Sequence, residues 1–219
     1  MLVNNSSMKC PLCSSSHCAF WCEADAPKSS YFSCGNCKLI WLDETLRPSR
    51  TEEESRYRTH ENITDDARYM AYLSRTAQPV VEHLRSGARG LDFGCGPTEG
   101  MKALLSPQGF SVESYDPIFF SHQALLNFRY DFVLCCEAAE HFFSPKKEFE
   151  TLARLVEVGG WLGVSSELAP SREEFPRWWY RRDPTHVVFY QKETVEWIAR
   201  NGGWKIEKLE SPLWLLQKI

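Results

Sequence analysis

Two Cys-x-x-Cys pairs near the start of the chain carry the most specific chemical signal. Cys10 and Cys13 form the first pair, and Cys34 and Cys37 form the second after an interval of 20 residues. Four thiolates, supplied two at a time by tight turns, are the ligand set of a structural, tetrahedral zinc site. The spacing therefore predicts a small zinc ribbon over residues 8–42.

The neighbours of these pairs have less specific interpretations. Gly35 lies inside the second pair, where it offers the conformational freedom that a tight turn favours. His17, Cys18 and Cys22 are close by but surplus to a site with four ligands. A ribbon of this size is too small to catalyse a reaction, so it either recognises a substrate or supports the fold.

A glycine-containing turn is the second group of interest. Residues 91–97 read Leu-Asp-Phe-Gly-Cys-Gly-Pro and connect a predicted strand to a predicted helix. Glycine has no Cβ, so backbone N–H groups of such a turn can approach a ligand, and nucleotide-type cofactors bind at this edge of an α/β sheet. The dinucleotide fingerprint requires a third glycine where Glu99 stands, with Gly100 one place late. An NAD-dependent oxidoreductase is therefore disfavoured.

The third group follows a predicted buried strand, where Glu137, Glu140 and His141 have the spacing Glu-x-x-Glu-His. On a helical turn, positions i, i+3 and i+4 share one face, so the three side chains are expected to converge at the carboxyl edge of the sheet. Two carboxylates and an imidazole suit a divalent cation such as Mg²⁺, Mn²⁺ or Fe²⁺. A general-base role of a histidine without metal, or a structural role, are the alternatives.

Alternating apolar runs and amphipathic stretches predict an α/β fold with a parallel sheet that positions these groups. A helix is expected from Thr64-Asp65-Asp66 to a stop at Gly87, kinked or divided by Pro79. The expected strands cover residues 90–93, 111–115, 132–136 and 161–165, the expected helices cover 98–106, 145–157 and 192–201, and the runs 205–210 and 213–218 are expected to form a closing antiparallel pair.

The totals set the wider frame. The 219 residues carry a net charge of −4, so no global basic surface for nucleic acid is present, although Arg177, Arg181 and Arg182 form a local basic cluster. No apolar stretch approaches the roughly 20 residues of a membrane span, and Met1 to Lys9 lack the apolar core of a signal peptide, which favours the cytoplasm and no membrane partner. We divide the chain into a ribbon (8–42), a helical linker or cap (43–88) and an α/β domain (89–219).

The glycine turn resembles the first motif of class I methyltransferases that use S-adenosylmethionine (SAM). The resemblance implies a Rossmann-like fold and SAM as cofactor, with Asp92 organising the loop and Gly94, Cys95 and Gly96 approaching the cofactor. It also implies that Asp116, at the end of the second strand, accepts both ribose hydroxyls.

The chain departs from the pattern of that family after Asp116. Only 14 residues separate Asp116 from Asp131, which is too few for a normal helix and a third strand. The family's adenine-binding residue comes from that segment, so it stays unassigned. Thr98 also stands where the family often has glycine.

The Glu-x-x-Glu-His stretch is similar to a motif of the ubiquinone-pathway O-methyltransferases and of the enzymes that methylate the 2′-hydroxyl at the 3′ end of small RNAs. That resemblance implies a divalent cation on Glu137, Glu140 and His141, completed by a second histidine, for which His186 is the candidate. His141 and His186 are accordingly the predicted catalytic residues, and Glu137 is also assigned to the cofactor pocket.

As a whole, the chain resembles small bacterial proteins that join a zinc ribbon to a class I methyltransferase domain. The resemblance implies methyl transfer to an oxygen of an unidentified small molecule, RNA or protein; the alternative is a zinc-ribbon binding protein with an inactive methyltransferase-like domain. The aromatic and basic residues 175–182 either bind that acceptor or form a lid over the sheet. Tyr57 and His60 are further candidates for covering the cofactor pocket.

Overall fold

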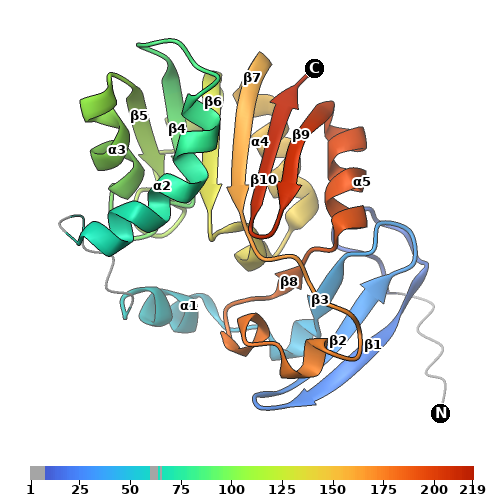
Figure 1. Ribbon diagram of the computed structural model, residues 1–219. Coiled ribbons are helices and arrows are strands. Elements are labelled where there is room, and N and C mark those ends of the chain that lie inside the picture. Colours follow the sequence, from blue (N-terminus) through green and yellow to red (C-terminus); the bar gives the residue numbers. More distant parts are fainter. Residues whose placement is uncertain (1–7, 60–63, 65) are drawn as a thin grey trace.

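A six-stranded sheet forms the centre of the molecule in the computed structural model, which describes residues 8–59, 64 and 66–219 (Figure 1). Its strand order is β5-β4-β6-β7-β10-β9, with the first four strands parallel and β10 antiparallel to both of its neighbours. The predicted α/β fold and the closing antiparallel pair are thus confirmed. The strands are β4 (Arg89–Phe93), β5 (Ser111–Tyr115), β6 (Tyr130–Cys136), β7 (Val156–Ser165), β9 (Trp204–Glu210) and β10 (Leu213–Lys218).

Helices cover both faces of this sheet because the central strands are apolar on both sides. On β6, Phe132 and Leu134 face α2 (Ala67–Val81) and α3 (Gly100–Leu105). Val133 and Cys135 alternate with them and face α4 (Pro145–Leu155) and α5 (Lys192–Gly202). Within the described part of the chain, no helix combines the length and the apolar character that crossing a membrane requires.

The strand expected to be missing is missing. β5 forms the edge of the sheet, and a short 3₁₀ helix over Gln123–Asn127 takes the place of a longer crossover before β6. This connection leaves the carboxyl end of β5 open toward the cofactor side of the sheet.

The helix predicted ahead of the first parallel strand is present but shorter than expected. Asp66 caps the N-terminus of α2, and the helix ends at Val81 rather than near Gly87. Pro79, inside the last turn, lacks the N–H that a continuing helix needs, and the chain leaves through i+3 turns. Gly100 begins α3, where an added Cβ would lie 2.6 Å from Leu73 of α2, so this glycine permits close packing of the two helices.

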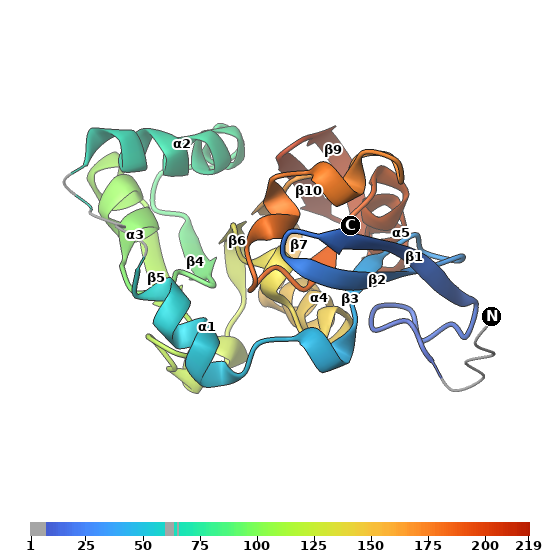
Figure 2. The ribbon, with the colours of Figure 1, turned by 90° about the horizontal axis from the view of Figure 1, so that it is seen from below.

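A second, four-stranded sheet lies beneath the carboxyl ends of the parallel strands (Figures 1 and 2). Three of its strands, β1 (Cys18–Asp25), β2 (Lys28–Cys34) and β3 (Ile40–Leu42), belong to the predicted ribbon. The fourth, β8 (Val188–Phe189), comes from the α/β region and pairs antiparallel with β3. The ribbon therefore shares one sheet and one apolar core with the larger part of the chain.

Helix α1 (Arg50–Tyr57) connects the ribbon to the α/β region and begins with a capping box formed by Ser49 and Glu52. Seen from below the sheet, α1 crosses between the β5 side of the molecule and the ribbon (Figure 2).

Candidate active site

A cavity of about 1270 Å³ opens at the carboxyl ends of β4, β5 and β6. One half, which we call the cofactor half, is formed by the glycine turn, the end of β5 and the 3₁₀ helix 123–127. The other, which we call the acceptor half, contains side chains from the Glu-x-x-Glu-His stretch, α1 and His186. All residues predicted for the cofactor site and for the second metal line this cavity, namely Asp92, Gly94, Cys95, Gly96, Asp116, Glu137, Glu140, His141 and His186.

The two glycines of the turn have the backbone conformation that favours glycine. Gly94 has φ +83° and Gly96 has φ +65°. A Cβ added to Gly94 would also lie 2.5 Å from the Cβ of Ala138, which belongs to the turn that carries Glu140. Gly94 is therefore the point at which the two halves of the cavity touch.

Asp116 holds the glycine turn in place through its carboxylate. The Oδ2 atom accepts a hydrogen bond from the Gly96 N–H (3.1 Å), and Oδ1 accepts from the N–H groups of Ile118 (2.8 Å) and Phe119 (3.0 Å). A carboxylate offers about four acceptor positions, so three are already taken by the backbone. Since one acceptor position remains, the expected pair of bonds to two ribose hydroxyls is not available to Asp116 in this arrangement.

Asp92 provides a buried carboxyl group at the centre of the cofactor half. Its side chain is 4% exposed, and burial together with the nearby Asp116 raises its pKa to about 8. A cationic ligand in the cavity would favour the ionised carboxylate, so this site fits a positively charged cofactor.

The 3₁₀ helix 123–127 contributes the wall that sequence reasoning left unassigned. Gln123, Leu126 and Asn127 line the cavity beside Asp116, and the Gln123 amide donates to the Tyr115 hydroxyl at 3.1 Å. Their position depends on a short connection without a recognisable motif, so the sequence held no signal for them.

In the acceptor half, Glu140, His141 and His186 bring their ligand atoms within 4.8 Å of one another. Glu140 Oε1 lies 3.8 Å from His141 Nε2 and 3.9 Å from His186 Nε2. These distances are too long for hydrogen bonds, but they suit groups that share an ion between them.

The backbone orients both imidazoles. His141 Nδ1 lies 2.9 Å from the Thr185 carbonyl, and His186 Nδ1 lies 2.7 Å from the Tyr180 carbonyl. A carbonyl can only accept, so each Nδ1 carries the proton and each Nε2 lone pair is directed toward Glu140. Burial lowers the pKa of His141; burial and the neighbouring His141 lower that of His186 to about 3. Such a ring is a weak general base at neutral pH.

Glu140 is fully buried, and neither of its carboxyl oxygens has a hydrogen-bond partner among the described residues. Burial raises its pKa to about 7, although Tyr180 and Ser166 beside it act in the opposite direction. A buried carboxyl without a partner is costly. A cation between Glu140 and the two Nε2 atoms would satisfy it.

Glu137 does not join the cluster of three potential ligands, contrary to the helical spacing argument. Its φ is +47°, and the helical turn covers only Ala139–His141, so Glu137 is turned away from Glu140. Its carboxyl accepts from Ser165 Oγ at 2.7 Å and from the Tyr180 hydroxyl at 3.2 Å. Burial and the charge of Glu140 raise its pKa to about 7. Sequence reasoning missed Ser165 and Tyr180, which no motif marks.

Helix α1 closes the acceptor half from the side of the ribbon. The Tyr57 ring lies 5.2 Å from the His141 ring, edge to face, and Tyr57 lines the cavity as predicted. Arg56 donates from Nε (3.1 Å) and Nη2 (2.7 Å) to Asp183, and Arg50 donates to the Pro117 carbonyl at 3.2 Å. His60, the other predicted covering residue, lies outside the described residues.

The aromatic and basic segment 175–182 packs against the ribbon instead of the cavity. Arg181 is 2% exposed, while Trp179 is 63% exposed on the outer surface. Trp178 packs on Phe175 and Phe189. Of this segment, the contact with the site that we find is made by Tyr180.

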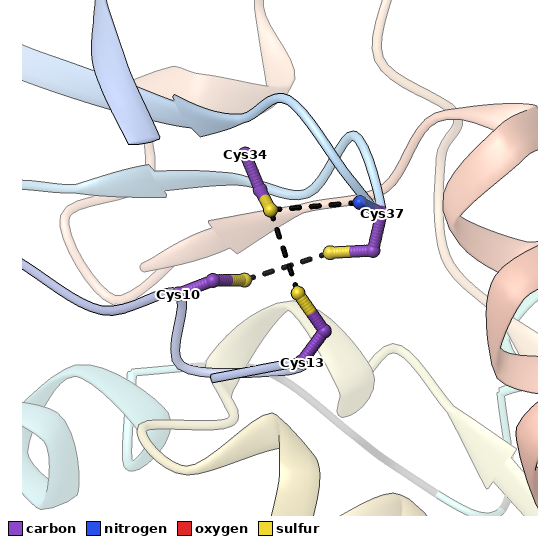
Figure 3. A group of neighbouring side chains, drawn as sticks. All are labelled: Cys10, Cys13, Cys34 and Cys37. Carbon is purple, nitrogen blue, oxygen red and sulfur yellow. Dashed lines mark hydrogen bonds between the residues drawn. The ribbon is translucent and has the colours of Figure 1, made fainter. Parts of the chain in front are cut away.

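The four predicted zinc ligands form a separate cluster (Figure 3). The ligand atoms of Cys10, Cys13, Cys34 and Cys37 lie within 4.8 Å of one another, and the closest Sγ–Sγ distances are 3.4 and 3.5 Å. These values are far above the ~2.05 Å of a disulfide. They approach the ~3.8 Å edge of a tetrahedron with zinc–sulfur distances of ~2.3 Å.

Each Cys-x-x-Cys pair forms the same turn. The residue after the second cysteine, Ser14 or Lys38, donates its N–H to the carbonyl of the first cysteine at 3.0 Å. Ser14 has φ +58° and Lys38 has φ +61°, so these residues, and not Gly35, adopt the left-handed conformation. Gly35 is required for another reason, because an added Cβ would lie 2.6 Å from the His17 ring. His17, Cys18 and Cys22 stay outside the four-thiol cluster.

Comparison with known proteins agrees with this geometry. Residues 60–209 match the family model described as "Methyltransferase domain". Among solved structures, the chain is similar to 1,6-didemethyltoxoflavin-N1-methyltransferase of Burkholderia thailandensis with bound 1,6-didemethyltoxoflavin and S-adenosylhomocysteine (12% identity, TM-score 0.55, covering 82% of this chain and 95% of that chain). It is also similar to an O-methyltransferase family protein from the same organism (14% identity, TM-score 0.53, covering 80% and 65%). No curated protein sequence matches the chain.

A Rossmann-like sheet with a glycine turn, a buried acid and an acid at the end of the second strand defines a cofactor-dependent transferase of class I. The family match spans more than half of the chain, so the chain belongs to the methyltransferase-domain family and is a SAM-dependent methyltransferase.

Proposed function

We propose that the chain transfers the methyl group of SAM to a hydroxyl oxygen, with a divalent cation held by Glu140, His141 and His186. The observation that carries this proposal is the fully buried Glu140 carboxyl without a partner, faced by two Nε2 atoms at 3.8 and 3.9 Å. Two imidazoles and one carboxylate form a ligand set typical of Fe²⁺ or Mn²⁺.

A cation in this cluster supplies positive charge that makes a neighbouring hydroxyl easier to deprotonate. The residues of the chain then have separate tasks. Thr185 and Tyr180 fix the two imidazoles through their carbonyls, as outer partners of metal-binding histidines commonly do. The cavity aligns the acceptor with the methyl group, which is the main contribution of a protein to such a transfer.

Two further assignments accompany this proposal. Asp92, Gly94, Cys95, Gly96 and Asp116 form the SAM side of the cavity, with Asp116 acting chiefly through the backbone of the glycine turn. The four clustered thiols hold a structural zinc ion, a proposal supported by the matching geometry of the two turns.

Binding of Mn²⁺, followed by electron paramagnetic resonance, tests the acceptor metal. Wild-type protein is expected to bind one Mn²⁺ beyond its zinc, and Glu140→Gln and His186→Ala are expected to lose it. Glu148→Gln is the matched control, because burial also raises the pKa of Glu148 to about 7 while this residue belongs to neither potential metal cluster of the described residues.

Transfer of labelled methyl from SAM to phenolic, RNA and protein acceptors, with and without EDTA, tests the reaction. The expected product is an alkali-stable methyl ether whose formation needs the cation. Full turnover in EDTA by wild type, Glu140→Gln and His186→Ala would reject the metal-assisted mechanism.

Metal analysis tests the ribbon site. One zinc per chain is expected for wild type and for Cys18→Ser, and none for Cys10→Ser. Wild type purified without chelator and containing no zinc would refute this assignment.

A further inference from the structure

The main chain beside His186 is held by the ribbon. The two-residue strand β8 pairs with β3, with Trp41 opposite Val188 and Ile40 opposite Phe189. A strand this short has little stability of its own, so its position depends on its neighbours. β3 begins three residues after Cys37, a member of the four-thiol cluster, and all its residues are buried.

A hydrogen-bond relay continues from β3 to the acceptor half of the cavity. The Leu42 N–H donates to the Val187 carbonyl at 2.9 Å, and the Val187 N–H donates to the Glu140 carbonyl at 2.9 Å. Val187 directly follows His186. Two potential metal ligands, Glu140 and His186, are therefore connected to the ribbon through a single residue.

A buried arginine makes a second connection. Arg181 is 2% exposed, and its guanidinium donates to the Ala26 carbonyl between β1 and β2 (2.9 Å) and to the Pro176 carbonyl (3.0 Å). Its neighbour Tyr180 supplies the carbonyl that holds His186 Nδ1. Burying a guanidinium is costly, so the contact with the ribbon fixes this segment firmly.

From these two connections we infer that the ribbon positions the acceptor metal centre: the four-thiol cluster, when it holds zinc, fixes β3 and the β1–β2 turn, and these fix His186 and Glu140. The glycine turn stands apart from this path, since its N–H groups donate to Tyr115 and Asp116 of β5. Loss of zinc is thus expected to weaken the acceptor half while SAM binding persists. The inference rests on the metal centre proposed above.

Three measurements on the full-length protein test this inference. They are SAM affinity by calorimetry, Mn²⁺ affinity by electron paramagnetic resonance, and the His186 tautomer by long-range ¹H–¹⁵N spectra. Zinc-stripped wild type and Cys37→Ser are compared with zinc-loaded wild type, and Cys18→Ser serves as a control outside the four-thiol cluster. Arg181→Met is a second variant, which leaves the thiols intact and removes the contact with Ala26.

Zinc loss and Arg181→Met are expected to weaken Mn²⁺ binding by about 10-fold or more, as changes to outer partners of metal ligands do. The fixed Nδ1–H tautomer of His186 should give way to an exchange-averaged signal, and SAM affinity should stay within about threefold of wild type. Rescue by zinc should restore the first two in the stripped protein.

Equal loss of SAM and Mn²⁺ binding would indicate general unfolding and overturn the inference, as would unchanged Mn²⁺ affinity and an unchanged His186 tautomer. If zinc-loaded wild type binds no Mn²⁺, the proposed metal centre fails by itself. The His186 tautomer then still decides whether the ribbon positions that imidazole. If wild type holds no zinc, Arg181→Met decides the same question.

Discussion

The two halves of the cavity are built in different ways. In the cofactor half, the central contacts come from two short segments at the ends of neighbouring strands, and Asp116 binds three backbone N–H groups within and beside them. In the acceptor half, His141 and His186 depend on carbonyls of Thr185 and Tyr180, and the adjoining main chain depends on the ribbon. The first half is local in sequence, whereas the second is assembled from remote segments.

This difference separates binding of the cofactor from selection of the acceptor. Local turns of backbone can persist while remote segments around them change, because their geometry is set by nearby residues. An acceptor half that combines parts of the ribbon, α1 and the segment before β8 can vary its shape without disturbing the glycine turn. The following substitutions are chosen to affect one half, or the point where both meet.

The largest effect is expected at Gly94, because it touches both halves. In Gly94→Ala, the new Cβ would adopt φ +83° and lie 2.5 Å from the Cβ of Ala138. Displacing a binding turn by about 1 Å can cost about 100-fold. We expect a loss of SAM affinity of at least about 100-fold, measured by calorimetry, accompanied by weaker Mn²⁺ binding.

Gly159→Ala is the matched control for that substitution. Gly159 has the same φ of +83°, but an added Cβ there meets nothing within 4 Å. It should therefore show the cost of backbone strain alone, on the order of 1 kcal/mol in the free energy of unfolding, with unchanged SAM affinity. Equal losses of SAM affinity in the two variants would show that the contact with Ala138 does not connect the halves.

Asp92→Asn should affect the cofactor half only. Burial and Asp116 raise the pKa of Asp92 to about 8 in the folded protein, above the ~3.9 of an unfolded chain. The folded state therefore holds a proton that the unfolded state has lost, and the free energy of unfolding falls as pH rises from about 4 to about 8. Without SAM, the Asn variant should be more stable than wild type at pH 8 by a few kcal/mol, measured by urea unfolding.

The same variant should bind SAM about 10-fold more weakly, since the carboxylate that meets a cationic ligand is gone. Mn²⁺ affinity should not change. A variant without any stability gain at pH 8 would contradict the buried, strained state of Asp92, and a parallel fall in Mn²⁺ affinity would contradict the separation of the halves.

The contrast between the halves also explains what the sequence could predict. The glycine turn, the acid at the end of β5 and the absent third strand depend on spacing within about 40 residues, so patterns of apolar and small residues were sufficient. The two Cys-x-x-Cys pairs lie farther apart than one turn, but thiolate chemistry restricts them to one arrangement.

Prediction was weaker where a side chain depends on backbone conformation or on a remote partner. The helical argument placed Glu137 with Glu140, but φ +47° at Glu137 ends the shared face before it begins. The pairing of β3 with β8 joins segments almost 150 residues apart through strands of three and two residues. Such short strands have no periodicity that a sequence could reveal.

The smallest effect is expected at the ion pair between α1 and the segment that carries His186. Arg56 donates to Asp183 at 2.7 Å, and although burial raises the pKa of Asp183, its bonds with Arg56 and Thr185 hold that pKa well below its usual range. The Arg56 side chain is 42% exposed, so solvent screens the pair and its contribution is about 0.2–1 kcal/mol. Arg56→Gln should therefore lower methyl transfer only about two- to fivefold, without a change in SAM affinity.

Arg58→Gln is the control, because Arg58 forms its ion pair within α1, with Glu54 at 2.6 Å, and is more exposed at 64%. It removes the same charge from the same helix without loosening its contact with Asp183. Kinetics at low and high salt separate the two, since only wild type and Arg58→Gln should lose activity as salt screens the Arg56–Asp183 pair. If Arg56→Gln instead weakens SAM binding, α1 belongs to the cofactor half, and the boundary between the halves lies on the ribbon side of this helix.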